Sequence, residues 1–228
     1  MLTIIHGKVI TMAGKDYEDG FVSIQDGKIS AVGDMADCPA RKGEDGVICA
    51  EGNLVMPGII EAHCHMGITE EKKGMEGDDC NENVDPVTPY LRAIDAINPM
   101  DAAFDDALRA GITSAMVGPG SSNVVGGQFA FIKTHGRCID QMIVKAPAAM
   151  KVAFGENPKV NFSGQNVSPA TRMAIAAMLR EELFKAREYQ RKGKSDKNQE
   201  KDFRYECWLP VLDGQIPLKA HVHRADDI

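Results

Sequence analysis

The sequence lacks the patterns that identify several common classes of protein. Its 228 residues carry a formal net charge of -7, and no basic stripe is strong enough to predict nucleic-acid binding. The one basic cluster, residues 185–201, is interleaved with Glu and Gln, so we interpret it as a solvated helix end rather than a phosphate-binding patch. Because neither a phosphate loop nor a dinucleotide-binding glycine motif is present, a generic nucleotide-binding α/β protein is not expected.

The sequence also shows no sign of a signal peptide or of a membrane-spanning segment. Residues 1–14 lack the basic region and the long apolar region of a signal peptide. No apolar run approaches the roughly 18 residues of a membrane span. None of the six cysteines forms a C-x-x-C pair, which argues against a zinc ribbon or a redox motif. The sequence therefore predicts a cytoplasmic protein with reduced thiols and no membrane partner.

The hydrophobic pattern divides the chain into two parts. A hydrophobic fraction of 43% is ordinary for a globular protein. Residues 2–50 contain short alternating runs, and Asp26-Gly27 between two of them predicts a type I′ hairpin. The pattern changes after Pro57-Gly58. We therefore expect a small β segment over residues 1–57 and a second domain over residues 58–228.

The second part alternates strands with helices. "GIIEAHCH", "MDAAFDDALRAG" and "ITSAMVG" predict a strand, a helix and a strand, which implies a parallel pair joined by a right-handed crossover. Residues 67–100 are expected to form a long polar loop. A long helix is predicted after Ser168-Pro169, with Ser as its N-cap. This order indicates a parallel α/β sheet or barrel, in which the chemistry lies at the carboxyl ends of the strands.

Two histidine pairs are the main candidates for chemistry. His63 and His65 close one predicted strand, and His221 and His223 close another. Since side chains alternate along a strand, the members of each pair point to the same side, and Cys64 points away to pack in the core. Neutral imidazole is the commonest protein ligand of zinc and similar divalent ions. The two pairs therefore predict a metal site.

A site that holds two metals usually also needs a bridging oxygen ligand. Lys151 and Glu156 both lie at or just beyond a predicted strand. Glu156 could ligate directly, whereas Lys151 could ligate only as a carbamate, which carries two oxygens and a negative charge. Spacing alone leaves two simpler alternatives open, a lysine whose amine reaches solvent and a glutamate in a loop.

A loop rich in Gly and Ser, residues 119–128, follows one of the strands. It is either a flexible connection or a segment that contacts the substrate. The candidate contacts at and around it are Gly118, Gly120, Gly126, Gly127 and Gln128.

"VMPGIIEAHCHMG", residues 55–67, resembles the signature of the amidohydrolase superfamily, in which Pro-Gly and two apolar residues precede Asp/Glu-x-His-x-His. "GFVSIQDGKISAVG" is similar to the hairpin of that family's small β-sandwich. "SAMVGPGSSNVVGGQFAFIK", "MKVAFGENPK" and "KAHVHRADDI" resemble the imidazolonepropionase-related branch. The resemblance extends over residues 4–228.

The resemblance implies a partial (β/α)₈ barrel, about strands 1–5, preceded by part of a β-sandwich. It implies metal binding by His63 and His65 at strand 1 and by a carboxylated Lys151, ahead of Glu156, at strand 4. At strand 5 it implies His221, ahead of His223. The implied cofactor is one or two divalent ions, zinc first. The implied reaction is hydrolysis of an amide or other non-peptide C–N bond of a small molecule by metal-activated water.

The sequence departs from the family in one respect. Relatives carry a strand-6 histidine and a strand-8 aspartate, the expected general base, and both would lie beyond Ile228. We therefore hypothesise an N-terminal fragment or truncated product, with a catalytically inactive assembly subunit as the alternative. The expected partners are a second copy of the chain or the missing C-terminal part.

Overall fold

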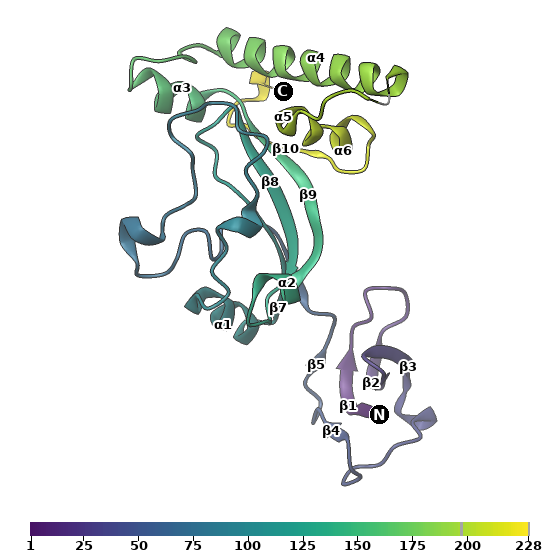
Figure 1. The fold of residues 1–228 in the computed structure, drawn as a ribbon. Coiled ribbons are helices and arrows are strands. Elements are labelled where there is room, and N and C mark those ends of the chain that lie inside the picture. The colour runs from purple at the N-terminus through teal and green to yellow at the C-terminus, as the bar shows by residue number, and fades with distance from the viewer. Residues whose placement is uncertain (197, 228) are drawn as a thin grey trace. The chain divides into compact units, whose positions relative to one another are not determined.

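A computed structural model describes residues 1–196 and 198–227 (Figure 1). The chain divides into two compact units, Met1–Gly58 and Ile59–Ile228. This boundary lies one residue after the boundary between residues 57 and 58 that the sequence predicted. Each unit has its own sheet, so each is described by itself.

The first unit is built on a five-stranded sheet in the order β3-β2-β1-β4, with β5 also paired to β1. Side chains of β1 alternate between buried and exposed, and Ile5 and Val9 point into the core. Asp26 and Gly27 have φ of 53° and 73°, the two positive values that a type I′ turn requires, so the predicted hairpin is confirmed. The elements are β1 (Leu2–Val9), β2 (Tyr17–Gln25), β3 (Lys28–Asp34), η1 (Met35–Asp37), β4 (Val47–Cys49) and β5 (Leu54–Val55).

The second unit has a five-stranded sheet in the order β10-β9-β8-β7-β6. Strand β6 pairs in parallel with β7, and the chain crosses between them through α1 (Ala102–Arg109), as predicted. Strands β9 and β10 are also parallel. The strands are β6 (Ile59–Cys64), β7 (Ile112–Val117), β8 (Val125–Lys133), β9 (Ile143–Ala153) and β10 (Leu218–His221).

The predicted parallel sheet is interrupted at β8, which runs antiparallel to both neighbours. A parallel neighbour needs a crossover of about a dozen residues or more. Residues 118–124 are too short for one, and β8 returns to β9 through α2 (Ile139–Met142) alone. Consequently the glycine-rich segment expected to be a loop partly belongs to β8, which contains Gly126, Gly127 and Gln128.

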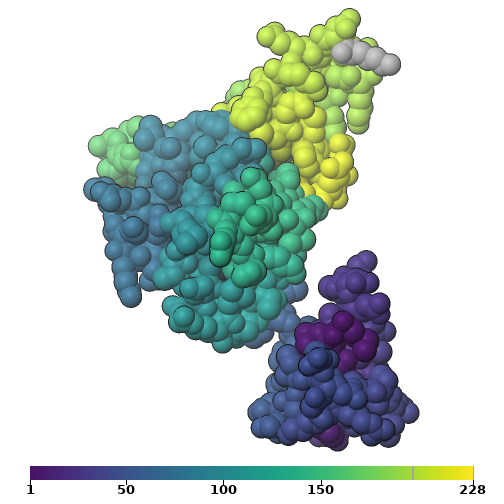
Figure 2. Space-filling view, turned by 60° about the horizontal axis from the view of Figure 1, so that its bottom comes forward, coloured from purple at the N-terminus to yellow at the C-terminus, as the bar shows by residue number. Residues whose placement is uncertain are grey.

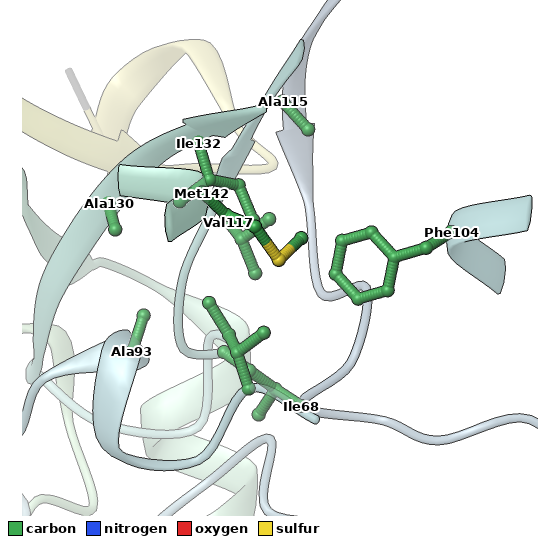
Figure 3. Close-up of a cluster of buried hydrophobic side chains, with 9 residues drawn as sticks. Ile68, Ala93, Phe104, Ala115, Val117, Ala130, Ile132 and Met142 are labelled. Carbon is green, nitrogen blue, oxygen red and sulfur yellow. The ribbon is translucent and has the colours of Figure 1, made fainter. Parts of the chain in front are cut away.

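Two apolar clusters anchor this sheet. The first, shown in Figure 3, joins β7, β8, α1, α2 and the segment after β6, and Cys64 packs against it. The second joins β8 and β9 to the helices near the end of the chain. The first cluster contains Ile68, Ala93, Ile97, Phe104, Ala115, Val117, Ala130, Ile132 and Met142. The second contains Val87, Val124, Val125, Met150, Val152, Ile175, Leu179, Ala186 and Trp208.

Four helices follow β9: α3 (Glu156–Ser163), α4 (Arg172–Ser195), α5 (Phe203–Glu206) and α6 (Leu209–Leu212). The long helix does not begin at Ser168, as the sequence suggested. The side chain of Thr171 instead accepts a hydrogen bond from the Ala174 backbone N–H at 3.1 Å. A threonine hydroxyl satisfies a free N–H of the first turn as well as serine does.

The expected polar loop over residues 67–100 is partly packed against the sheet. It contains the short turns η2 (Gly74–Gly77) and η3 (Ala93–Asp95), and its Ile68, Val87 and Ile97 are buried. In the space-filling view its blue surface makes up much of the visible face of the second unit (Figure 2). A last turn, η4, covers Ala225–Asp227. Across the described parts of the chain, we find no helix with the length and apolar character needed to cross a membrane.

Candidate metal centre

The face of the second sheet opposite the apolar clusters carries most of the predicted site. Met150 and Val152 point into the second cluster, so Lys151 between them projects from the other face. Phe129 of β8 lies at the middle of this face. Its ring centroid is 5.3 Å from that of His63 and 5.7 Å from the Lys151 Nζ. Strands β6, β8 and β9 therefore bring two of the predicted ligands to one aromatic ring.

His63 and His65 lie together at the end of β6. Their ring centroids are 5.2 Å apart, with the planes at 87°. The Nδ1 atom of His65 is 2.6 Å from the carbonyl oxygen of Gly118. Since a carbonyl can only accept, Nδ1 carries the proton, and Nε2 carries the lone pair of the neutral ring. This is the arrangement in which a histidine is oriented to bind a metal through Nε2.

The surroundings shift the pKa values of these two histidines in opposite directions. Desolvation of the ring and the positive charge of Lys151 lower the pKa of His63 to about 4, so its imidazole is neutral at pH 7. The pKa of His65 is raised, first by hydrogen bonding with the Cys80 thiol and then by the Gly118 carbonyl. Sequence reasoning missed Cys80, because it lies in an irregular segment that has no periodic pattern.

Lys151 is the most unusual residue of this face. It is 1% exposed, and its Nζ has no hydrogen-bond partner among the residues that the structure describes. Burial, with a further contribution from the charge of Lys219, lowers the pKa of Lys151 to about 8. A Cβ at Gly126 would approach the Lys151 Cγ to 3.3 Å, so the glycine leaves room for the lysine stem. The expectation of a lysine that reaches solvent is therefore wrong.

The second histidine pair is also brought together, but differently from the prediction. His221 ends β10, whereas His223 lies past the strand. Their Nε2 atoms are 2.9 Å apart, and the Nε2 of His223 is also 2.9 Å from the Oδ1 of Asn157. Burial and the charge of Lys151 lower the pKa of His221. His221 therefore shares surroundings with Lys151, while His223 is held by Asn157, a residue that the sequence did not single out.

Glu156, the other candidate bridge, is exposed in the first turn of α3. Over residues 1–196 and 198–227, it has no hydrogen bond or ion pair with any of the four histidines. Within the same ranges, no three His, Cys, Asp or Glu side chains converge closely enough to hold a metal ion. Any additional ligand from this chain must therefore be of another type, and Lys151 is the candidate that the fold provides.

The glycine-rich segment holds neighbouring backbone segments close together. A Cβ at Gly127, which has φ of 120°, would come 2.5 Å from the Leu91 carbonyl oxygen. The Gln128 side chain donates to the Pro89 carbonyl oxygen at 3.1 Å. Gly120 donates its N–H to the Cys80 carbonyl oxygen at 2.7 Å. These contacts fix the segment that carries Cys80, and contact with a substrate stays a prediction.

A substitution at Gly118 tests whether its carbonyl orients the His65 ring. A Cβ at this position would overlap the ring of Phe129. We expect Gly118→Ala to displace that ring and the carbonyl that orients His65, and to weaken metal binding by about 10–100-fold. Competition with a chromogenic chelator measures the affinity. Gly193→Ala is the control, because its Cβ would meet only the Gln199 side chain, at 3.1 Å. Equal metal affinity of Gly118→Ala and the unmodified chain would contradict this orienting role.

No family model matches the sequence. The chain is 30% identical over 212 residues to amidohydrolase tasK of Hapsidospora irregularis, covering 81% of this chain and 21% of that protein. It is 39% identical over 64 residues to imidazolonepropionase of Sphingopyxis alaskensis, covering 27% of this chain and 15% of that protein. An amidohydrolase structure from Thermotoga maritima MSB8 superposes with a TM-score of 0.92 at 35% identity, covering 100% of this chain and 59% of that one.

These similarities agree with the curled α/β sheet of the second unit, which fits part of a barrel. The chain belongs to the amidohydrolase superfamily. It matches the N-terminal part of its relatives and spans 21% of the tasK protein and 59% of the T. maritima chain.

Proposed function

We propose that this chain forms part of a metal-dependent amidohydrolase that hydrolyses an amide or other non-peptide C–N bond of a small molecule. The observation that carries the proposal is the Lys151 amine. It is buried, it has no hydrogen-bond partner among the described residues, and it shares one face of the sheet with His63. A fold that needed only packing at this position would do better with an apolar side chain, because an unsatisfied buried polar group costs about 1–3 kcal/mol.

The donor set fits a divalent ion, zinc first, once Lys151 is carboxylated. Its neutral Nζ attacks the carbon of carbon dioxide, an N–C bond forms, and one proton leaves to solvent. The resulting carbamate has two oxygens and one negative charge, and oxygen and imidazole donors together suit zinc. His63 and His65 would supply nitrogens to one ion, and His221 would supply a nitrogen to a second. A metal held there would lower the pKa of water and polarise the scissile carbonyl.

The residues of this chain hold the ligands in place. The Gly118 carbonyl fixes the tautomer of His65, and the lowered pKa of His63 leaves its ring neutral and free to bind. Through the family resemblance, we propose that a strand-6 histidine and a strand-8 aspartate as general base complete the site. A longer form of this chain or a separate C-terminal part would supply them. The six free thiols suit a reducing cytoplasm.

Metal content tests the proposal. The chain, purified in bicarbonate buffer and dialysed against zinc, is expected to retain about one ion or more by elemental analysis. His63→Ala and His65→Ala should each lower the affinity by more than about 100-fold, since even residues behind the ligands are worth 10–100-fold. His135→Ala is the matched control, because this histidine is exposed in the turn after β8. A chain that retains no metal, or an equal loss in His135→Ala, would overturn the proposal and favour an inactive assembly subunit.

A further inference from the structure

A second lysine, Lys219, occupies the same face of the sheet as Lys151. The two residues are directly in register across the parallel strands β9 and β10, so their side chains project to the same side. The Nζ atoms of both lie near the Phe129 ring, at 5.4 Å for Lys219 and 5.7 Å for Lys151. The two ammonium groups therefore share one small region between the histidine pairs.

Lys219 also connects the two edge strands of the sheet. Its Nζ donates a hydrogen bond of 2.7 Å to the carbonyl oxygen of Ala62, on β6. Strands β6 and β10 are the first and last strands in the sheet order. Ala62 directly precedes His63, and Lys219 lies two residues before His221. The Lys219 head group is thus held between the strand ends that carry the two predicted groups of histidine ligands.

The charges of this face do not balance in the described residues. The Lys151 Nζ has no hydrogen-bond partner, and the hydrogen bond of the Lys219 Nζ is to an uncharged carbonyl. Neither lysine forms an ion pair within residues 1–196 and 198–227. Two neighbouring cations repel each other, and a charge taken out of water is retained only when it is paired. An anion placed between the two lysines would balance both charges.

We infer that Lys219 is a positioning residue that forms an ion pair with the carboxylated side chain of Lys151 and orients that carbamate toward the histidines. The inference rests on the proposed function, because it assumes that Lys151 is carboxylated. Carboxylation forms the N–C bond to carbon dioxide and releases a proton, so it places a negative charge beside the Lys219 ammonium. The same ammonium keeps its hydrogen bond to Ala62, which fixes the carbamate relative to β6.

The test measures carboxylation directly. The metal-free chain is equilibrated with ¹³C-bicarbonate, and the carbamate carbon is quantified by ¹³C NMR for the unmodified protein, Lys219→Met, Lys219→Gln and Lys219→Arg. Lys145→Met is the matched control, because the Lys145 Nζ likewise donates to a backbone carbonyl, that of Gln215 at 3.0 Å, but is exposed elsewhere on β9. Zinc affinity is measured in parallel by chelator competition.

We expect Lys219→Met and Lys219→Gln to need at least about tenfold more bicarbonate for half-carboxylation, and to bind zinc about 10–100-fold more weakly. Lys219→Arg should retain most of both properties because it keeps the charge. Saturating bicarbonate should restore the carbamate in Lys219→Met, which a purely structural role would not allow. If Lys219→Met does not fold, Lys219→Gln, which removes the charge and keeps a hydrogen-bond donor on a shorter side chain, gives the same comparison.

The outcomes separate this inference from the proposed function. Equal carboxylation of Lys219→Met, Lys219→Gln and the unmodified chain would overturn the inference, and would assign Lys219 to the substrate or to the sheet alone. A similar loss in Lys145→Met would also overturn it. An unmodified chain that neither takes up ¹³C-bicarbonate nor binds zinc would instead overturn the proposed function itself.

Discussion

Replacing Lys151 by Met is expected to stabilise the metal-free protein and to abolish its metal site. Methionine fills a similar volume beside Phe129 and carries no polar group that must be satisfied. The Lys151 amine is buried without a partner among the described residues, which costs about 1–3 kcal/mol, so the free energy of unfolding should rise by that amount. Zinc affinity should fall by more than about 100-fold, because the proposed bridging carbamate is lost.

The expected rise in the free energy of unfolding should depend on pH. This dependence distinguishes the removal of a buried amine from a change in packing alone. The pKa of Lys151 is about 8 in the folded chain and 10.5 in an ordinary setting. Between these values the unfolded chain binds more protons than the folded one, so the stability of the unmodified protein rises with pH. The advantage of Lys151→Met should therefore be complete below about pH 8 and should decrease as the pH approaches 10.5. Urea unfolding at a series of pH values in chelator measures it.

In the presence of zinc, the unmodified chain should become more stable than Lys151→Met. A ligand present at 100 times its dissociation constant stabilises the folded state by about 2.7 kcal/mol, and only the unmodified chain should gain this in zinc and bicarbonate. Lys145→Met is the control, and should change neither stability nor zinc affinity because Lys145 is exposed. Loss of stability in metal-free Lys151→Met, or unchanged zinc affinity, would show that Lys151 is a structural residue.

The local sequence pattern is enough to predict part of this site. The period of two along a strand predicts that His63 and His65 point together, and their ring centroids are 5.2 Å apart. The same period could have identified Lys219, because it lies two residues before His221 and so shares its face. The packed core also follows from pattern in β9, where the buried Met150 and Val152 turn Lys151 to the opposite face.

Other features depend on contacts that no local pattern records. The direction of β8 follows from the short connection before it and from its pairing with two strands. Cys80 reaches His65 from a segment without regular structure, and Asn157 meets His223 from the first turn of α3. Side chains that arrive from irregular segments have no period to predict their direction, so sequence reasoning placed the strand ends that carry the histidines but not their surroundings.

Replacing Glu182 by Ala is expected to cause the largest loss of stability outside the site. Glu182 lies on α4 and is only 5% exposed, which is unusual for a carboxylate. Its Oε1 accepts hydrogen bonds from the Arg204 Nε at 2.8 Å and from the Trp208 Nε1 at 3.1 Å, and its Oε2 accepts from the Arg204 Nη2 at 3.0 Å. Trp208 is completely buried in the second cluster, so its indole N–H has no access to water.

Breaking a buried pair by removing one partner costs about 3–5 kcal/mol. The Arg204 side chain is 32% exposed and can recover part of its hydration, so about 3 kcal/mol is expected for Glu182→Ala. For a protein of this size, that lowers the melting temperature by roughly 6–12 °C. Glu182→Gln should cost less, because its amide oxygen can still accept from Trp208.

Glu181→Ala is the matched control, one residue away on the same helix. Its side chain is 63% exposed and pairs with Lys185, four residues further along, and such exposed ion pairs contribute little to stability. Thermal unfolding followed by circular dichroism compares the variants. Because α4 packs through Ile175 and Leu179 against the cluster that includes Met150 and Val152, Glu182→Ala should also loosen β9. Hydrogen exchange at Val152 should then be faster in Glu182→Ala than in Glu181→Ala, whereas equal exchange and equal melting temperatures would show that the buried pair contributes nothing to the strand that carries Lys151.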